Sequence, residues 1–208
     1  QAKMVAEKFG LLHIAPGDIF RQEVKAGTDL GRIVEGIMAK GLLVPDDVTI
    51  KIIEQRLSTE QAVNGFVLDG FPRNIAQADA LEGVLEAGGG KIDLVINLVV
   101  PEEELFQRSR TRRVCPICGK SYNVELDPPK IEGKCDSCSA GLIVRKDDNP
   151  ETVKERLRLY HEVTQPLCEY YGRDGVVIPI DGCGDVDAIF NRILESIKSK
   201  GFVRDANF

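Results

Sequence analysis

The sequence predicts an α/β fold in which helices cover both faces of a doubly wound parallel sheet, interrupted by a small metal-bound insert. Short apolar segments alternate with amphipathic segments along most of the chain, which is the pattern of parallel strands joined by helices. Two Cys-x-x-Cys pairs, at residues 115–118 and 135–138, fall inside this pattern and mark the insert. The 208 residues suit one such domain with small insertions, or two compact domains.

The first elements follow from turn residues and spacing. Residues 1–9 are amphipathic at helical spacing, and Gly10 ends this helix. A short apolar strand is expected at residues 11–14. Pro16 then begins a helix to about residue 25, because the fixed φ of proline suits a first helical turn.

Two further helices complete the first quarter of the chain. Residues 29–38 form one, which Gly41 breaks. Residues 46–57 form the other. Its first turn carries Asp46 and Asp47, whose negative charge the helix dipole favours there.

The middle of the chain repeats the strand–helix pattern. Residues 65–68 are a buried strand, and a helix follows at 75–87. Residues 94–100 form a near-continuous apolar run, which is typical of a parallel strand covered on both faces. A helix is expected over residues 102–112.

The last third contains the insert and three more elements. Residues 114–144 are rich in Cys, Gly and Pro and lack long periodicity. One long helix is expected at 151–171, a strand at 176–180 and an amphipathic helix at 186–200.

The two cysteine pairs predict a metal site for zinc, or for a substitute such as iron or cobalt. Each Cys-x-x-Cys turn supplies two sulfurs, and the loop between the pairs brings them together; the ligands are Cys115, Cys118, Cys135 and Cys138. Four thiolates leave no open position for water, so a structural role is favoured over a catalytic one. A segment of this size buries little core, and metal is expected to hold it together.

Polar residues that suit phosphate chemistry occur at two places, one after an expected strand and one near the start of an expected helix. Asp69, Gly70 and Arg73 come directly after the strand at 65–68, where ligands bind in open α/β sheets. A carboxylate there can orient magnesium-bound waters, and a guanidinium can bind phosphate. Arg21 lies one turn into a helix, a reasonable anion site. A simple turn and solvated arginines are the alternatives.

Arginines flank the insert on both sides. Arg108, Arg112 and Arg113 precede it, and Arg145 and Arg156 follow it. Such clusters are usually solvated faces. At the hinges of an insert, however, closure would bring them onto a substrate, as phosphoryl transfer requires.

Taken together, these motifs resemble the adenylate kinases, of the long bacterial type with a zinc-bearing lid. The resemblance covers essentially the whole chain. Its most specific elements are the segments 68–73, 112–114 and 145–148, together with Gln77 and Arg156. It implies a fold like that of the P-loop nucleoside monophosphate kinases. The core would be residues 1–14, 45–113 and 147–208, with an AMP-binding flap at 15–44 and a zinc-binding lid at 114–146.

The resemblance also implies an AMP site. Arg21 and Arg73 would grip the AMP phosphate, and Gln77 would read the adenine edge. The rest of that pocket would be formed by Pro16, Leu43, Val44, Gly70, Arg145 and Arg156. Where the family usually has Ser-Thr before Gly17, this chain has Ala15-Pro16. That difference leaves a kinase for another nucleoside monophosphate open as an alternative.

The implied ATP site lies beside it. Arg108 would stack on the ATP adenine, and the backbone around Gly184 would meet the same base. Asp69 would hold hydrated magnesium. The groups implied in catalysis are Asp69, Arg73, Arg112, Arg145 and Arg156. Implied substrates are ATP, AMP and ADP.

The sequence contains no Gly-x-x-x-x-Gly-Lys phosphate loop. The nearest lookalike, residues 88–91, lies between a helix and a strand, the reverse of the order that aims backbone N–H groups at phosphates. In the family this loop ends just before the residue that matches Gln1, and its strand lies in the middle of the sheet. We therefore expect the sequence to be part of a longer protein. A true truncation, or a strand supplied in trans, is the alternative.

Composition bears on the rival functions. A net charge of −6 argues against a zinc-ribbon module that binds nucleic acid. No apolar run approaches the ~20 residues needed to span a bilayer. We expect neither nucleic acid nor membrane as a partner. The resemblance implies a monomer in the cytoplasm. A catalytically disabled relative that binds AMP remains the other alternative.

Overall fold

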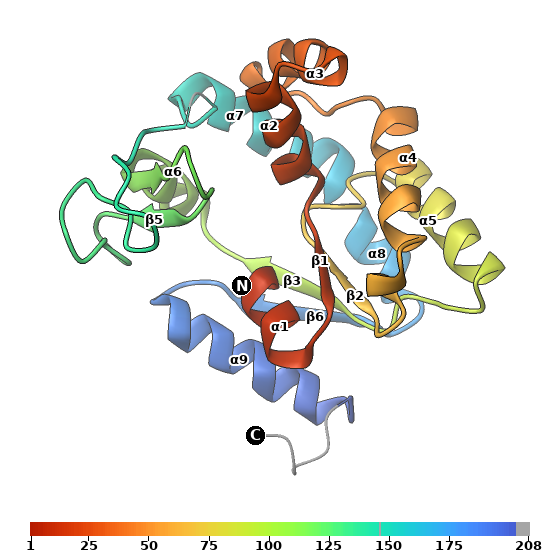
Figure 1. Cartoon of the computed structure of the whole chain (residues 1–208). Coiled ribbons are helices and arrows are strands. Elements are labelled where there is room, and N and C mark those ends of the chain that lie inside the picture. Colours follow the sequence, from red (N-terminus) through yellow and green to blue (C-terminus); the bar gives the residue numbers. More distant parts are fainter. Residues whose placement is uncertain (146, 203–208) are drawn as a thin grey trace.

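A computed structural model describes residues 1–145 and 147–202 (Figure 1). The expected lid boundary at Lys146 and the last expected core residues, 203–208, lie outside the described residues. In the described part of the chain, strands and helices alternate much as the sequence predicts, and the α/β class with parallel strands is confirmed. The 3-10 turn Glu60–Ala62 is an addition that the sequence did not indicate.

Two parallel strand pairs form the centre of the molecule. β1 (Leu12–Ile14) pairs with β2 (Phe66–Leu68), and β3 (Val95–Val99) pairs with β6 (Val177–Asp181). Within the described residues the two pairs are separate sheets, not one continuous sheet as expected. The further strand that the family resemblance implies in the middle of the sheet stays a prediction.

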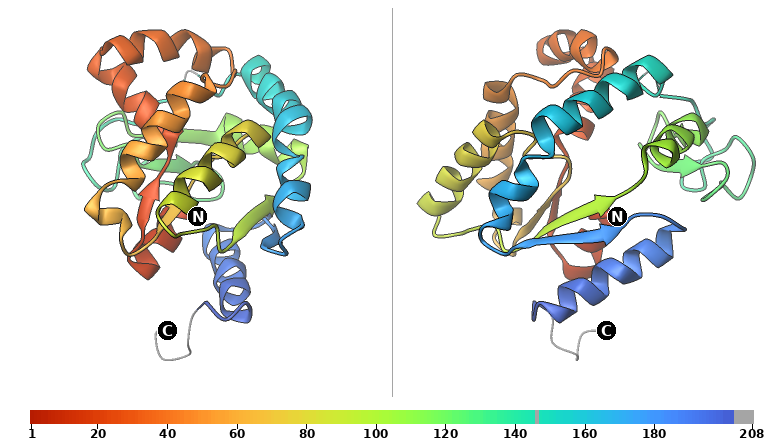
Figure 2. Two further views of the ribbon diagram at one scale, coloured as in Figure 1. Left: turned by 90° about the vertical axis from the view of Figure 1, so that its right-hand side faces the viewer. Right: turned by 180° about the vertical axis from the view of Figure 1, so that it is seen from behind.

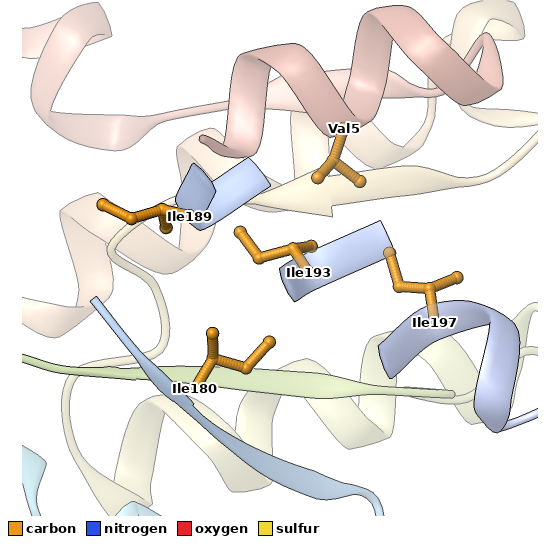
Figure 3. Close-up of a cluster of buried hydrophobic side chains, with 5 residues drawn as sticks. All are labelled: Val5, Ile180, Ile189, Ile193 and Ile197. Atoms are coloured by element: carbon orange, nitrogen blue, oxygen red, sulfur yellow. The ribbon is translucent and has the colours of Figure 1, made fainter. Parts of the chain in front are cut away.

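Helices cover the β3–β6 pair from opposite sides (Figure 2). α1 (Ala2–Phe9) and α9 (Val186–Ser199) lie on one side, and α8 (Leu167–Gly172) lies on the other. Figure 3 shows the first of these interfaces, where apolar side chains of α1, β6 and α9 meet; they are Val5, Ile180, Ile189, Ile193 and Ile197. Three isoleucines recur along α9 at helical spacing, which is why one face of that helix is buried.

The β1–β2 pair has its own apolar layer. α4 (Asp46–Leu57) and α5 (Ile75–Ala87) pack there against the strands. The buried members of this cluster are Ile14, Ile53, Phe71, Leu81 and Leu85. This packing fixes the start of α5 beside the start of α4, which matters for the site.

The predicted flap is a helical hairpin. α2 (Pro16–Ala26) and α3 (Asp29–Ala39) cross closely at Gly31, where an added Cβ would overlap the backbone carbonyl of Glu23. Phe20, Val34 and Val44 form its buried core. Val48 and Ile52 of α4 also pack against this cluster, so the hairpin is anchored to the rest of the molecule through α4.

The insert projects from the strands between α6 and α7 (Figure 1). α6 (Glu102–Thr111) leads into β4 (Arg112–Val114), which pairs with β5 (Ser121–Asn123). The sequence placed Arg112 in the helix. Its backbone is extended instead, because Arg112 pairs with Asn123 in the lid hairpin.

The predicted long helix at 151–171 is wrong. α7 (Pro150–Leu159) runs into a π turn, Tyr160–Thr164, and α8 begins only at Leu167. The cause is Pro166, which has no backbone N–H to continue the helical hydrogen bonding.

Strand β3 is less covered than its apolar run suggests. Its first residues are half-buried, whereas Leu98 and Val99 are 38% and 53% exposed. Coverage on both faces is therefore wrong for the carboxyl end of this strand. No helix in the described part of the chain combines the length and the apolar character needed to cross a bilayer.

Candidate active site and metal centre

One pocket gathers residues from α2, α3, α4, α5 and α7, from the loops after α3 and β2, and from the segment before α7. It contains most of the residues predicted for the AMP site, namely Pro16, Arg21, Leu43, Val44, Gly70, Arg73, Gln77 and Arg156. Arg145 is not among the described residues that line it. Sequence reasoning missed other lining residues, such as Phe20, Met38, Thr49 and Asp147. The first three follow no chemical motif, so only the fold reveals them.

Guanidinium groups converge on this pocket. The Nε of Arg73 donates to the carbonyl oxygen of Gly70 at 2.9 Å, which turns the side chain back over the loop after β2. Burial lowers the pKa of Arg73, and the positive charges of Arg156 and Arg21 lower it further. The arrangement concentrates positive charge where a phosphate would neutralise it.

Two carboxylates at the base of the lid lie close to arginines of this region and partly balance their positive charge. Asp147 lies 3.8 Å from Arg156, and Asp148 lies 3.5 Å from Arg112. The side chain of Asp148 is fully buried, and burial raises the pKa of its carboxyl. Burial also lowers the pKa of Arg145, together with the nearby charges of Arg21 and Arg112. Arg145 thus lies near the same cluster, although it does not line the pocket.

Asp69 lies at the carboxyl end of β2, as the sequence predicts. Its carboxylate is 54% exposed and approaches Nε2 of His13 at 3.4 Å. An exposed carboxylate at this sheet edge suits hydrated magnesium, which keeps most of its waters. No motif in the sequence singles out His13. Its contact with Asp69 instead places it at the edge of the site.

The buried Gln77 (2% exposed) is held by polar contacts at the start of α5. Its side-chain oxygen accepts from the backbone N–H of Arg73, and its nitrogen donates to Asp46. Asp46 was read from the sequence only as a charge at a helix start. Because α4 and α5 lie close together in the folded chain, Asp46 also accepts a hydrogen bond from Gln77.

Arg108 and Gly184, the two residues predicted for the ATP base, lie outside the lining of this pocket and near each other. A side-chain nitrogen of Arg108 on α6 donates to the carbonyl oxygen of Gly182 at 2.8 Å. Gly182 belongs to the same loop as Gly184, whose φ of 106° suits glycine. Glu104 accepts from two nitrogens of Arg108 and fixes its guanidinium plane.

The four lid cysteines form one cluster. Their sulfur atoms all lie within 4.8 Å of one another, with Cys115 and Cys135 buried and Cys118 and Cys138 exposed. A tetrahedral zinc site with Zn–S bonds of ~2.3 Å needs sulfurs ~3.8 Å apart. The pairs Cys115–Cys138 and Cys118–Cys135 are separated by 3.4 and 3.5 Å. The donor set and its spacing therefore fit zinc.

Tyr122 supports this cluster from the lid hairpin. Its hydroxyl donates to the sulfur of Cys135, which lowers the pKa of that thiol to about 6. The hydroxyl in turn accepts from the backbone N–H of Asp136 at 2.8 Å. Such second contacts orient thiolate ligands.

Comparison with known proteins decides the family. A family model described as adenylate kinase matches residues 1–176. The chain belongs to the adenylate kinase family. It is 46% identical to the adenylate kinase of Clostridium kluyveri over 192 residues, covering 92% of this chain and 88% of that protein. It is also 46% identical to that of Kosmotoga olearia over 96% of this chain and 93% of that protein.

A third relative agrees with these two. The adenylate kinase of Lachnospira eligens is 47% identical over 195 residues, covering 94% of this chain and 92% of that protein. Identity at this level over most of the chain supports adenylate kinase function, hence a nucleoside monophosphate kinase. The roles of individual site residues stay predictions.

Proposed function

We propose that the protein catalyses reversible phosphoryl transfer from ATP to AMP, giving two molecules of ADP, and so balances the adenine nucleotides. The observation that carries this proposal is one pocket with Arg21, Arg73 and Arg156 together and the buried amide of Gln77 also in its lining. Cations that suit a phosphate and an amide that suits a base are what a nucleoside monophosphate requires. Pro16 also lines the pocket, and a different monophosphate is the nearest alternative.

In this scheme the predicted residues share nucleotide binding and catalysis, and Arg73, Arg145 and Arg156 serve in both. Arg21 and Arg73 bind the AMP phosphate, while Gln77 hydrogen-bonds the adenine edge between the walls formed by Leu43, Val44 and Gly70. Arg108 and the backbone at Gly184 hold the ATP base. Arg112, Arg145 and Arg156 surround the transferring group. These cations stabilise negative charge that grows in the transition state.

The reaction needs no protein nucleophile. An oxygen of the AMP phosphate attacks the γ-phosphorus of ATP in line, a new P–O bond forms, and the bond to the β-phosphate oxygen breaks. Magnesium, for which Asp69 would supply a hydrated contact, neutralises phosphate charge when bound. The protein contributes positioning, cationic side chains and exclusion of water.

The predicted domains fit this chemistry. We assign the core to residues 1–14, 45–113 and 147–208, the flap to 15–44 and the lid to 114–146. A contact between the two moving parts supports closure, because the ammonium of Lys25 on α2 donates to the carbonyl oxygen of Pro116 at 2.7 Å. Zinc bound by the four cysteines would hold the lid in shape. We further propose a cytoplasmic monomer.

A coupled assay for ADP formation from ATP, AMP and magnesium tests the proposal. Arg73→Ala removes one phosphate contact, so kcat/KM for AMP should fall about tenfold to a hundredfold, the range for one charge-assisted hydrogen bond. The matched control is Arg56→Ala, since Arg56 is an exposed arginine at the end of α4, outside the pocket. Equal losses in both variants would contradict the assigned role of Arg73.

A further inference from the structure

The starts of α4 and α5 share a network of three side chains. Asp46, in the first turn of α4, accepts from the side-chain nitrogen of Gln77 at 2.6 Å. Both oxygens of Asp46 also accept from Asn74, each at 3.0 Å. Asn74 caps α5, and its oxygen accepts from the backbone N–H of Gln77 at 2.8 Å. The carboxylate is thus tied to the exact segment that carries Gln77.

The side-chain amide of Gln77 is held at both of its polar atoms. Its nitrogen donates to Asp46, while its oxygen accepts from the backbone N–H of Arg73 at 2.8 Å. A carboxylate can only accept and a backbone N–H can only donate. Turning the amide over would place its oxygen against Asp46 and its NH2 group against the Arg73 N–H. Both contacts would then be repulsive, so only one orientation is stable.

The fixed amide keeps one free hydrogen and one free lone pair. A primary amide has two N–H donors and an oxygen with two lone pairs, and one of each is already used. A 6-aminopurine offers an N–H donor at position 6 and an acceptor at N1. A 6-oxopurine instead offers an acceptor oxygen at position 6 and an N–H donor at N1. The orientation of the amide therefore decides which base can bind.

We propose that Asp46 is a positioning residue that fixes the Gln77 amide in the orientation that selects a 6-aminopurine over a 6-oxopurine. This inference rests on the proposed function, because it assumes that the base of the monophosphate meets Gln77. Asp46 itself does not touch the base in this scheme. It acts through Gln77, with the backbone N–H of Arg73 as the second restraint.

The test compares AMP with inosine monophosphate as acceptors in the full chain. Asp46→Ala should raise the KM for AMP about tenfold, the effect of one hydrogen bond. It should lower the ratio of kcat/KM for AMP to that for inosine monophosphate by about the same factor and leave the KM for ATP unchanged. Asp46→Asn, which keeps one acceptor, should retain most of the preference.

The design separates positioning from stability and charge. The ratio of two acceptors on one preparation is independent of how much protein is folded. If Asp46→Ala yields no folded protein, Asp46→Ser replaces it with the same expectation. Asp47→Ala removes the same charge from the same helix turn and should leave the ratio unchanged. In a Gln77→Ala background, Asp46→Ala should cause no further change in the ratio.

Three results would overturn the inference: an unchanged ratio in Asp46→Ala, an equal change in Asp47→Ala, or a full change in the Gln77→Ala background. A wild-type chain that phosphorylates neither monophosphate would instead contradict the proposed function. A wild-type chain that prefers AMP, with an Asp46→Ala variant that prefers it equally, would reject this inference alone.

Discussion

Gly41, which follows α3 of the flap, packs against α7, the helix that carries Arg156. Replacing Gly41 should therefore lower the stability of the protein and displace Arg156. The residue has a φ of 75°, in the left-handed region. A Cβ there would lie 2.7 Å from the carbonyl oxygen of Thr152 and 3.1 Å from Cγ of Arg156. Gly41 also lines the candidate AMP pocket. Gly41→Ala therefore adds backbone strain and a steric clash at the same point.

The two costs can be estimated separately. An alanine held in the left-handed region costs ~1–2 kcal/mol. Relieving the clash requires the start of α7 to move away, and overpacking of this kind costs ~1–3 kcal/mol. The free energy of unfolding should fall by ~2–5 kcal/mol in all. Displacement of Arg156 should weaken AMP binding about tenfold or more, because small misplacements of a positioning group are costly.

A matched control isolates the clash. Gly27 ends α2 with a φ of 67°, and an added Cβ would meet nothing within 4 Å. Gly27→Ala therefore has the strain without the clash. Urea unfolding followed by circular dichroism gives stability, and titration with AMP gives the dissociation constant. If Gly41→Ala and Gly27→Ala lose equal stability and bind AMP equally well, the reasoning about this contact is refuted.

Three further predictions follow from the lid, the flap and the surface. Gly31→Ala should destabilise the flap because its Cβ would overlap the Glu23 carbonyl, whereas Gly36→Ala, with open space around it, should be neutral or stabilising in the same urea assay. A chelator should remove about one equivalent of zinc and make the lid, but not the core, sensitive to protease; a resistant lid would argue against a structural metal. The side chains of Gln165 and Glu102 raise the pKa of His161, so its stabilising effect should be full below the unfolded pKa of ~6.5 and be lost as pH rises through the folded value. His161→Ala should therefore cost more stability at about pH 5.5 than at about pH 8.5, and an equal loss at both would contradict the assignment.

Local patterns predicted most elements because each carried its own signal. Gly10 and Gly27 take the left-handed conformation that ends a helix, and the start and end of α5 fall where periodicity placed them. The exceptions arise where another signal competes. Pro166 breaks the expected long helix, and strand pairing in the lid takes Arg112 out of α6.

The candidate site was predictable where it followed motifs. The loop after β2 supplied Gly70 and Arg73, and the cysteine spacing supplied the metal cluster. Asp46 could not be found in this way. A carboxylate in a first helical turn has an ordinary explanation, and its contact with Gln77 exists only because α4 packs beside α5.

Which parallel strands pair could not be predicted from the segments themselves, although the family resemblance places a further strand in the middle of the sheet. Strand pairing depends on which backbones meet in space, and no single segment carries that information.

The most direct test of the account is the nucleotide balance of the reaction, followed by phosphorus NMR with ATP, AMP and magnesium. The account predicts that one ATP and one AMP disappear for every two ADP formed, without release of inorganic phosphate, and that the reverse reaction proceeds from ADP alone. Consumption of ATP with release of inorganic phosphate and unchanged AMP would contradict it, as would the absence of any turnover in the full-length protein.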